Sequence, residues 1–135
     1  MARTDQLIVA SQRQSEAIDI TEPVQKLVAD TGIGDGVCTV YVAHTTAGVF
    51  INENADPDVL HDLLTTLDRL VPWDRNYRHA EGNAAAHIKA SLLGPSQSIP
   101  VRGGRLRLGR WQGIFFAEFD GPRERQVQVT VVEGK

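Results

Sequence analysis

The fold is organised around residues 44–62, which read HTTAGVFINENADPDVLHD. An apolar run at residues 37–43, VCTVYVA, leads into this stretch, and an amphipathic helical pattern at residues 56–71 leads out of it. His44 and the polar group at residues 52–54 therefore stand where a strand gives way to turns. Side chains in such positions carry function more often than the interiors of helices and strands do.

The length and composition indicate one globular domain spanning residues 1–135. The chain is 41% hydrophobic, and a chain of this length buries roughly 68% of its unfolded surface without disulfides or metals. Its 14 basic and 17 acidic residues give a net charge of -3, so we expect no general nucleic-acid binding and no binding to acidic membranes.

Cysteine usage and hydropathy suggest the compartment. The single Cys38 lies in an apolar strand pattern, which favours a buried packing thiol and a reducing environment. No basic and then apolar leader opens the chain, and no apolar run approaches the roughly 18 residues that a membrane span needs. We therefore expect a cytoplasmic protein without a membrane anchor.

The first third of the chain alternates strand and helix signals. Residues 6–12 and 16–20 predict two strands. Thr21 as the N-cap and Gly32 as the terminator predict a helix between them. The glycine-rich run at residues 32–36 precedes a strand instead of following one, so we interpret it as a turn and not as a phosphate-binding loop.

Two more helices are expected in the middle of the chain. Residues 48–52 predict a short partner strand, and Asp56 and Pro57 supply the N-cap and first turn of a helix that Pro72 stops. The alanine-rich run at residues 83–93 predicts the next helix, which a glycine and a proline terminate. The buried stripe of the first of these helices is predicted to be Val59, Leu60, Leu63, Leu64, Leu67, Leu70 and Val71.

The last third of the chain carries only strand signals. Residues 98–101 and 105–108 flank a Gly-Gly pair, which is typical of a two-residue hairpin turn. A long strand at residues 111–119, a turn at residues 120–123 and a closing strand at residues 126–133 follow. Strands with two or three helices, followed by a run of antiparallel strands, predict an α+β fold built mostly on antiparallel sheet.

Three histidines stand near the ends of predicted elements. His44 ends a strand, His79 precedes a helix and His87 lies within that helix. Imidazole is the commonest nitrogen ligand of zinc, so convergence of the three rings would create a metal site. The alternative is that they are buried or solvated imidazoles without a ligand, because the sequence contains no His-x-x-x-His pair. His61, on the polar side of its helix, is interpreted as a surface residue or as a contact to a ligand residue.

Two carboxylates and one amide are candidates for catalysis. Glu81 follows His79 by two residues, and Glu118 interrupts an apolar strand, where a charge is costly unless it is paired or faces a wet cavity. Alternatively, Glu118 simply alternates outward. Asn52 is placed to orient a substrate or a metal-bound histidine, although ordinary turn chemistry explains it equally well.

Arginines and hydroxyls in the same motifs suggest an anionic ligand. Guanidinium groups bind phosphate through two parallel hydrogen bonds, so Arg110 and Arg123 are candidates to hold a phosphorylated molecule. Thr45, Thr46 and Ser91 are candidate donors to the same anion. The remaining arginines of the last third alternate with apolar residues and are interpreted as a solvated strand face: Arg102, Arg105, Arg107 and Arg125.

Three motifs, in this order, resemble the YjbQ-like family. They are HTTA with INENADPD within residues 44–58, HAEGN with AHIKAS within 79–91, and GRWQG with EFDGPR within 109–123. The resemblance covers essentially the whole chain, and some members of the family are labelled secondary thiamine-phosphate synthases. It implies a metal or anion site at the three histidines and a homotrimer whose pocket lies near subunit interfaces.

The resemblance also implies an activity. Thiamine phosphate formation joins an aminopyrimidine pyrophosphate to a thiazole phosphate and needs a divalent cation. Histidine ligands suit zinc better than magnesium, so zinc is the metal we expect. The dedicated synthase is a (β/α)8 barrel, for which this chain is too short, so the resemblance implies at most a weak or secondary activity.

Three functions follow from these observations. We expect a metal-assisted enzyme that acts on a small phosphorylated metabolite. The alternatives are a non-enzymatic protein that binds a metal or a small anion, and a metal-dependent hydrolase of phosphate or acyl substrates.

Overall fold

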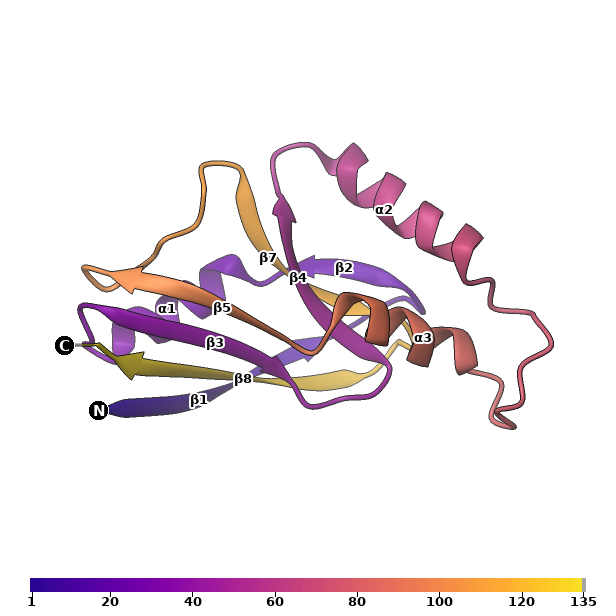
Figure 1. The fold of residues 1–135 in the computed structure, drawn as a ribbon, viewed down its shortest axis with the longest axis horizontal. Coiled ribbons are helices and arrows are strands. Elements are labelled where there is room, and N and C mark those ends of the chain that lie inside the picture. The colour runs from indigo at the N-terminus through magenta and orange to yellow at the C-terminus, as the bar shows by residue number, and fades with distance from the viewer. Residues whose placement is uncertain (135) are drawn as a thin grey trace.

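The computed structural model describes residues 1–134 and contains three helices and two antiparallel sheets (Figure 1). In chain order the elements are β1 (Ala2–Ala10), β2 (Glu16–Asp19), α1 (Thr21–Asp30), β3 (Gly36–Val42), β4 (Ala47–Glu53), α2 (Pro57–Leu70), α3 (Ala84–Leu93), β5 (Ser96–Arg102), β6 (Arg105–Leu106), β7 (Gln112–Glu118) and β8 (Glu124–Glu133). The predicted α+β class is confirmed.

The two sheets pack face to face, with α1 in the core that they share and with α2 and α3 on the other face of the smaller sheet. The larger sheet has the strand order β1-β8-β3-β5-β6 and the smaller sheet has the order β2-β7-β4. The core between the sheets holds the inward side chains of β3 and β8 together with apolar residues of β4, β7 and α1. Val127, Val129 and Val131 all point into this core, as their alternation predicts.

The smaller sheet is buried on both faces, which explains the unbroken apolar run of β7. Its second face, with Phe50 and Phe115, packs against apolar residues of α2 and α3. Those two phenylalanine rings stack with their centroids 5.3 Å apart. A strand covered on both sides needs apolar residues at successive positions, so the period-2 alternation is lost in β7.

One predicted strand pairing is wrong. Residues 48–52 were expected to partner the preceding strand, but β4 pairs with β7 in the smaller sheet, whereas β3 pairs with β5 and β8 in the larger one. The short connection at residues 43–46 therefore passes from one sheet to the other. Both strands carry buried apolar side chains that face the shared core, and this satisfies the same hydrophobic pattern without direct pairing.

Two details of the predicted helices also differ. Thr21 is the first residue of α1, not its cap; its hydroxyl accepts a hydrogen bond from Ile114 N at 2.9 Å and so ties the helix to β7. The stripe of α2 that was predicted to be buried is only half-buried from Val59 to Leu67, and Leu70 is 66% exposed; of the stripe only Val71, which follows the helix, is buried. The predicted cap of α2 is confirmed, since the carboxylate of Asp56 accepts a hydrogen bond from Asp58 N at 2.9 Å.

Helix α3 lies unusually close to β4. Ala85, Ala86 and Ala90 are buried at this contact, and a Cβ atom on Gly48 would come within 2.8 Å of the carbonyl oxygen of Gly94. The same carbonyl accepts a hydrogen bond from Val49 N at 3.1 Å. Small side chains at this contact therefore allow α3, which carries His87, to lie close to β4.

Cys38 is buried in the core, and burial raises the pKa of its thiol to about 11, as expected of a packing residue and not of a nucleophile. Within residues 1–134, none of the helices combines the length and the apolar character needed to cross a bilayer.

Candidate functional site

Several segments that are far apart in the chain enclose one polar cavity of about 700 Å³. The connection between β3 and β4, the connection between α2 and α3, the start of α3 and the turn between β7 and β8 all contribute to its wall. The cavity is lined by residues 43–46, Trp73, His79, Glu81, Asn83, His87, Asp120, Arg123 and Arg125. All three histidines singled out in the sequence therefore line a single cavity.

The backbone determines which nitrogen of His44 carries the hydrogen. Gln126 N donates to His44 Nε2 at 3.0 Å, so in the neutral ring the hydrogen is on Nδ1. Burial lowers the pKa of His44, and the positive charge of Arg125 lowers it further, which favours this neutral form. His44 is thus equipped to donate a hydrogen bond from Nδ1, whereas binding a metal through Nε2 would require it to release Gln126.

The other two imidazoles lie against each other. The rings of His79 and His87 meet edge to face, with centroids 5.1 Å apart and planes inclined by 80°. The exposed carboxylate of Glu81 is 3.9 Å from His79 Nε2. Within residues 1–134, no three side chains of the His, Cys, Asp or Glu type are grouped closely enough to hold an ion.

Glu118 is the most completely enclosed charge in the cavity region. It is 0% exposed and forms an ion pair with Arg125, which is 2% exposed. Ser11 Oγ and Arg125 Nε donate to its Oε1 at 2.8 and 2.9 Å, and Asp120 N donates to its Oε2 at 3.0 Å. Burial alone would raise the pKa of Glu118, but these hydrogen bonds outweigh burial and hold the pKa below its ordinary value. Glu118 is ionised and does not line the cavity.

Arg125 is the member of this buried pair that also lines the cavity, and it contributes a positive charge to the wall. Its Nη2 donates to Glu118 Oε2 and to Thr46 Oγ1, the latter at 2.8 Å, while Nη1 has no hydrogen-bond partner among residues 1–134. The interpretation of Arg125 as part of a solvated strand face is wrong. It occupies the same side of β8 as Val127 and Val129, and this period-2 register was the sequence signal that it points inward.

A second polar group stands on the turn between β7 and β8. Arg123 Nε donates to the carbonyl oxygen of Asp120 at 2.9 Å, and its Nη2 donates to Asp120 Oδ2 at 3.1 Å. Asn83 Nδ2 donates to the same carboxylate oxygen at 2.9 Å. Asn83 and Asp120 were not among the candidates from sequence, because their types and positions also fit a helix cap and a turn.

The other predicted site residues are divided between this cavity and distant places. Thr45 lines the cavity, and Ser91 lines an adjoining one of about 310 Å³ that shares His44 and His87 with it. Asn52 lies elsewhere, where its side chain accepts a hydrogen bond from Glu53 N at 2.7 Å. Arg110 is stacked on Trp111, with the guanidinium 4.7 Å from the ring centroid. The fourth histidine, His61, is exposed on α2.

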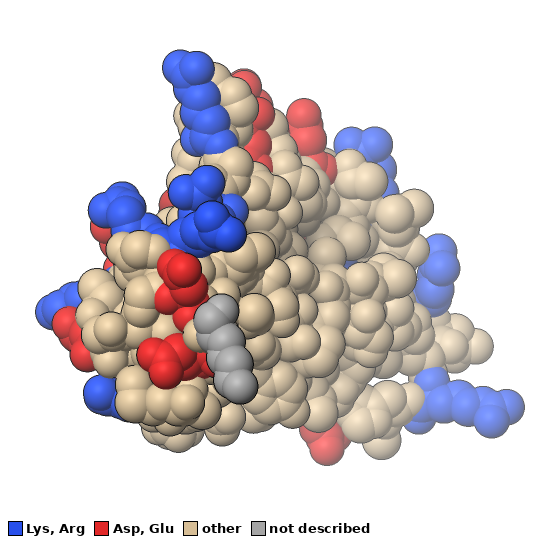
Figure 2. All heavy atoms as spheres, turned by 60° about the vertical axis from the view of Figure 1, so that its left-hand side comes forward, with Lys and Arg blue, Asp and Glu red and all other residues tan. Residues whose placement is uncertain are grey.

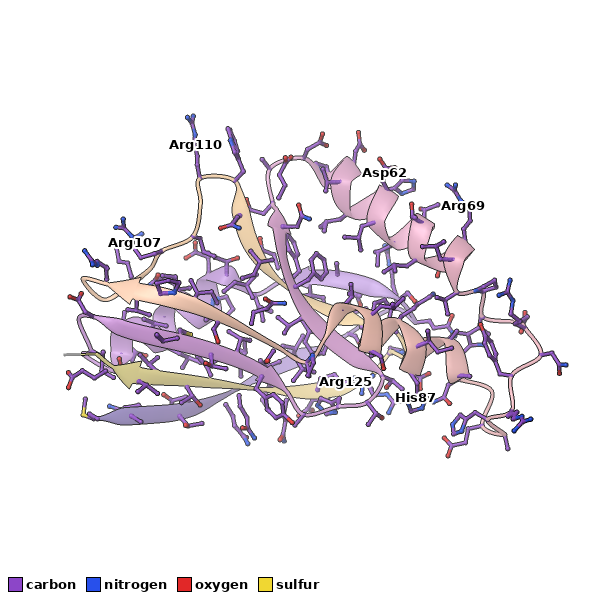
Figure 3. The ribbon with its side chains drawn as sticks, viewed as in Figure 1. Asp62, Arg69, His87, Arg107, Arg110 and Arg125 are labelled. Carbon is purple, nitrogen blue, oxygen red and sulfur yellow. The ribbon has the colours of Figure 1, made fainter. Side chains whose placement is uncertain are left out.

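The figures show how the two groups of arginines are separated. Arg125 and His87 lie at the α3 side of the molecule, whereas Arg107 and Arg110 project from the connection between β6 and β7 (Figure 3). Basic side chains gather in the upper left part of the view in Figure 2, with acidic side chains beside them. The exposed residues Arg102 and Arg105 belong to the β5–β6 hairpin. Of the two arginines first proposed to hold phosphate, only Arg123 lines the cavity.

The fold and the cavity define a class of small α+β proteins in which a two-sheet sandwich carries histidines and arginines around one polar pocket. The family model described as UPF0047 protein YjbQ-like matches residues 5–134. The chain belongs to this UPF0047 (YjbQ-like) family, which confirms the resemblance identified from the motifs.

Relatives and solved structures agree with this assignment. The UPF0047 protein YugU of Bacillus subtilis is 49% identical over 127 residues, covering 93% of this chain and 96% of the relative. The UPF0047 protein MJ1081 of Methanocaldococcus jannaschii is 47% identical over 127 residues, covering 94% of this chain and 92% of the relative. A YjbQ/UPF0047-family crystal structure from Clostridium acetobutylicum superposes with a TM-score of 0.93 at 50% identity, covering 95% of this chain and 99% of that chain.

Proposed function

We propose that the cavity binds a small phosphorylated metabolite and that Arg125 is the anchor of its phosphate group. The observation that carries this proposal is that the buried Arg125 lines the cavity while its Nη1 makes no hydrogen bond among the described residues. A guanidinium held by a buried carboxylate is already oriented, so little side-chain entropy is lost when it binds an anion.

Neighbouring donors support an anionic ligand over a neutral one. His44 offers Nδ1–H, Thr45 offers its hydroxyl, and Arg123 adds a second positive charge on the same wall. Hydrogen bonds from ionised donors to phosphate are about twice as strong as neutral ones. Glu118 acts on this ligand only through Arg125, whose position it sets.

The expected divalent metal stays a prediction. His79 and His87 are the residues that would hold it, because their ring nitrogens form no hydrogen bonds within residues 1–134 and the rings are in contact. Imidazole nitrogens suit zinc, which would act as a Lewis acid on a phosphoryl oxygen, but a catalytic zinc site typically takes three protein ligands and residues 1–134 group no third ligand with these two rings. His44 instead donates a hydrogen bond to the anion from Nδ1, because its Nε2 already accepts one from Gln126 N.

Calorimetric titration with inorganic phosphate tests the anion site. Changing Arg123→Gln removes one charge-assisted donor from the cavity and is expected to weaken phosphate binding roughly tenfold. Arg107→Gln makes the same chemical change on the exposed connection outside the cavity and is expected to leave the affinity within about twofold. Absence of phosphate binding to the unchanged protein, or equal loss in both variants, would refute the proposal.

Assays of product formation distinguish the proposed enzyme from a binding protein and from a hydrolase. A binding protein would retain tight phosphate binding and release no product, whereas a hydrolase would cleave model phosphate or acyl esters and lose this activity with a chelator. The thiamine-phosphate synthase activity implied by the family resemblance also stays a prediction. It should be abandoned if purified protein supplied with both substrates and a divalent metal forms no more product than the His44→Ala variant.

The homotrimer is likewise proposed, and the outer face of the larger sheet supports self-association. Cross-strand register places three complete rows of four outward residues on β1, β8, β3 and β5, and none of these residues is charged. Ile8, Val37, Tyr41 and Val132 on this face are exposed large apolar side chains. An extended uncharged face with exposed apolar groups is typical of a surface that another protein copy covers. The rows are Ala2, Val132, Val37 and Pro100; Thr4, Thr130, Thr39 and Ser98; and Gln6, Gln128, Tyr41 and Ser96.

A further inference from the structure

Two acceptor oxygens on residues that line the cavity have no hydrogen-bond partner within residues 1–134. Asn83 Nδ2 and Arg123 Nη2 both donate to Asp120 Oδ2, at 2.9 and 3.1 Å. The other carboxylate oxygen, Asp120 Oδ1, receives no hydrogen bond within residues 1–134. The amide oxygen of Asn83, Oδ1, is buried and also lacks a partner. A linked pair of side chains in the proposed phosphate cavity thus presents acceptors that nothing in the described protein satisfies.

The orientation of the Asn83 amide follows from Asp120. Rotating the amide by 180° would place its oxygen against the Asp120 carboxylate, and two acceptors would then face each other. Asn83 also stands at the N-cap of α3, a position where asparagine usually bonds the helix backbone, yet its side chain makes no such bond. A helix-capping role therefore does not explain the amide, and its buried oxygen remains to be accounted for.

We infer that Asn83 and Asp120 select a ligand that carries a cationic N–H donor in addition to its phosphate, that is, a zwitterionic phosphate ester. This inference rests on the proposed function and specifies its substrate class. The cavity holds both signs of charge, with Arg123 and Arg125 as donors and the carboxylates of Asp120 and Glu81 as acceptors. Asp120 is already paired with Arg123 through its Oδ2. A ligand with phosphate alone would bring a second negative charge near this carboxylate and leave its Oδ1 without a donor, whereas an ammonium group would supply a donor for Asp120 Oδ1 and for the amide oxygen of Asn83.

Two probes of equal size test the inference. Phosphoethanolamine and n-propyl phosphate differ only by an ammonium group in place of a methyl group, and each is titrated calorimetrically in a buffer that contains a chelator. Because the ammonium group would donate to a buried amide oxygen and to a carboxylate, we expect the protein to bind phosphoethanolamine more tightly than n-propyl phosphate, by about tenfold or more. Because propyl phosphate reports on the phosphate site alone, the ratio of the two affinities isolates the contribution of the ammonium group.

Variants assign this preference to residues. Asp120→Asn and Asn83→Leu are each expected to bring the affinity ratio close to one while propyl phosphate still binds. Asp62→Asn, the same carboxylate-to-amide change on the exposed face of α2, is expected to leave the ratio unchanged (Figure 3). If Asn83→Leu fails to fold, as judged by circular dichroism, Asp120→Asn still provides the test.

Each outcome has a definite meaning. If the unchanged protein binds the two probes with equal affinity, the inferred preference for an ammonium group is wrong, but the proposed phosphate site is not contradicted. A preference that survives in both variants overturns the assignment to Asn83 and Asp120. If neither probe nor inorganic phosphate binds, the proposed function fails and this inference fails with it.

Discussion

Among single residues, Glu118 and Arg125 form an enclosed pair of charges, and burying such a pair is costly. Both side chains are withdrawn from water, and their charges are compensated only by each other and by nearby hydrogen bonds. Removing one partner leaves the other as an uncompensated buried charge. The pair is therefore needed for stability and, through Arg125, for the electrostatics of the cavity.

Glu118→Gln should destabilise the protein strongly. The variant keeps the side-chain shape but leaves the guanidinium of Arg125 without its counter-charge, which is expected to lower the free energy of unfolding by about 3–5 kcal/mol. Glu133→Gln removes a carboxylate from a loose, exposed pair with the N-terminus and should cost less than about 1 kcal/mol. Urea unfolding measures both, and similar small losses would contradict the role given to the buried pair.

His44 predicts a pH dependence of stability. Its pKa is lower in the folded protein than in the unfolded chain, so the unfolded chain binds more protons between the two values. The contribution of His44 is complete above its ordinary pKa of about 6.5 and is lost as the pH falls from there through the folded pKa. His44→Gln keeps an acceptor for Gln126 N but cannot titrate, so its urea midpoint should fall less between pH 7.5 and pH 5.5.

A matched exposed histidine provides the control for this pH effect. His61 lies on the surface of α2, and His61→Gln should retain the pH dependence of the unchanged protein. Equal pH dependence in the His44 and His61 variants would show that His44 does not carry it.

At the scale of elements, the contact between α3 and β4 determines where His87 stands. Gly48 allows the carbonyl of Gly94 at the end of α3 to approach the strand, and the buried alanines of α3 keep the rest of the helix equally near. His79 is adjacent to His87, so a displacement of α3 would alter the position of both rings.

Gly48→Ala should therefore weaken both the fold and the site. The new Cβ atom would lie 2.8 Å from Gly94 O, so the end of α3 must shift, at an expected cost of about 1–3 kcal/mol. Phosphate affinity should fall with it, because the cavity wall includes His87 of α3 and Asn83, the N-cap residue of that helix. Gly34→Ala, where no atom lies within 4 Å of the added Cβ, should change neither unfolding nor binding.

At the scale of the whole molecule, the outer face of the larger sheet differs from the rest of the surface. A quarter to a third of an ordinary surface is charged, yet the three rows of outward residues on this face carry no charge. Its central row holds hydroxyls that bond one another, such as Thr4 and Thr130 with oxygens 2.9 Å apart.

A charge placed in this face should prevent assembly. Light scattering is expected to give a trimer for the unchanged protein and a monomer for Thr130→Lys, because an ammonium group in the middle of a protein interface is strongly unfavourable. Thr66→Lys, on the exposed side of α2, should remain trimeric. A monomeric unchanged protein, or a trimeric Thr130→Lys variant, would contradict self-association through this face.

Local patterns in the sequence predicted much of the fold. The cap at Asp56, the glycine pair of the β5–β6 hairpin and the inward valines of β8 depend on neighbouring residues, so each was readable before the structure. The pairing of β4 was not, because burial of its apolar residues is satisfied equally by pairing with β3 or by facing it across the core.

Periodicity and short motifs were sufficient to predict the α+β class, the family and the three histidines that line the cavity. The pairing of Glu118 with Arg125, and the contact between Asn83 and Asp120 in the cavity wall, became apparent only in the folded chain. The reason is physical: a local pattern shows which side of an element a residue occupies, but a charge or an amide acquires its role from the partner it meets. Those partners come from distant segments that only the folded chain brings together.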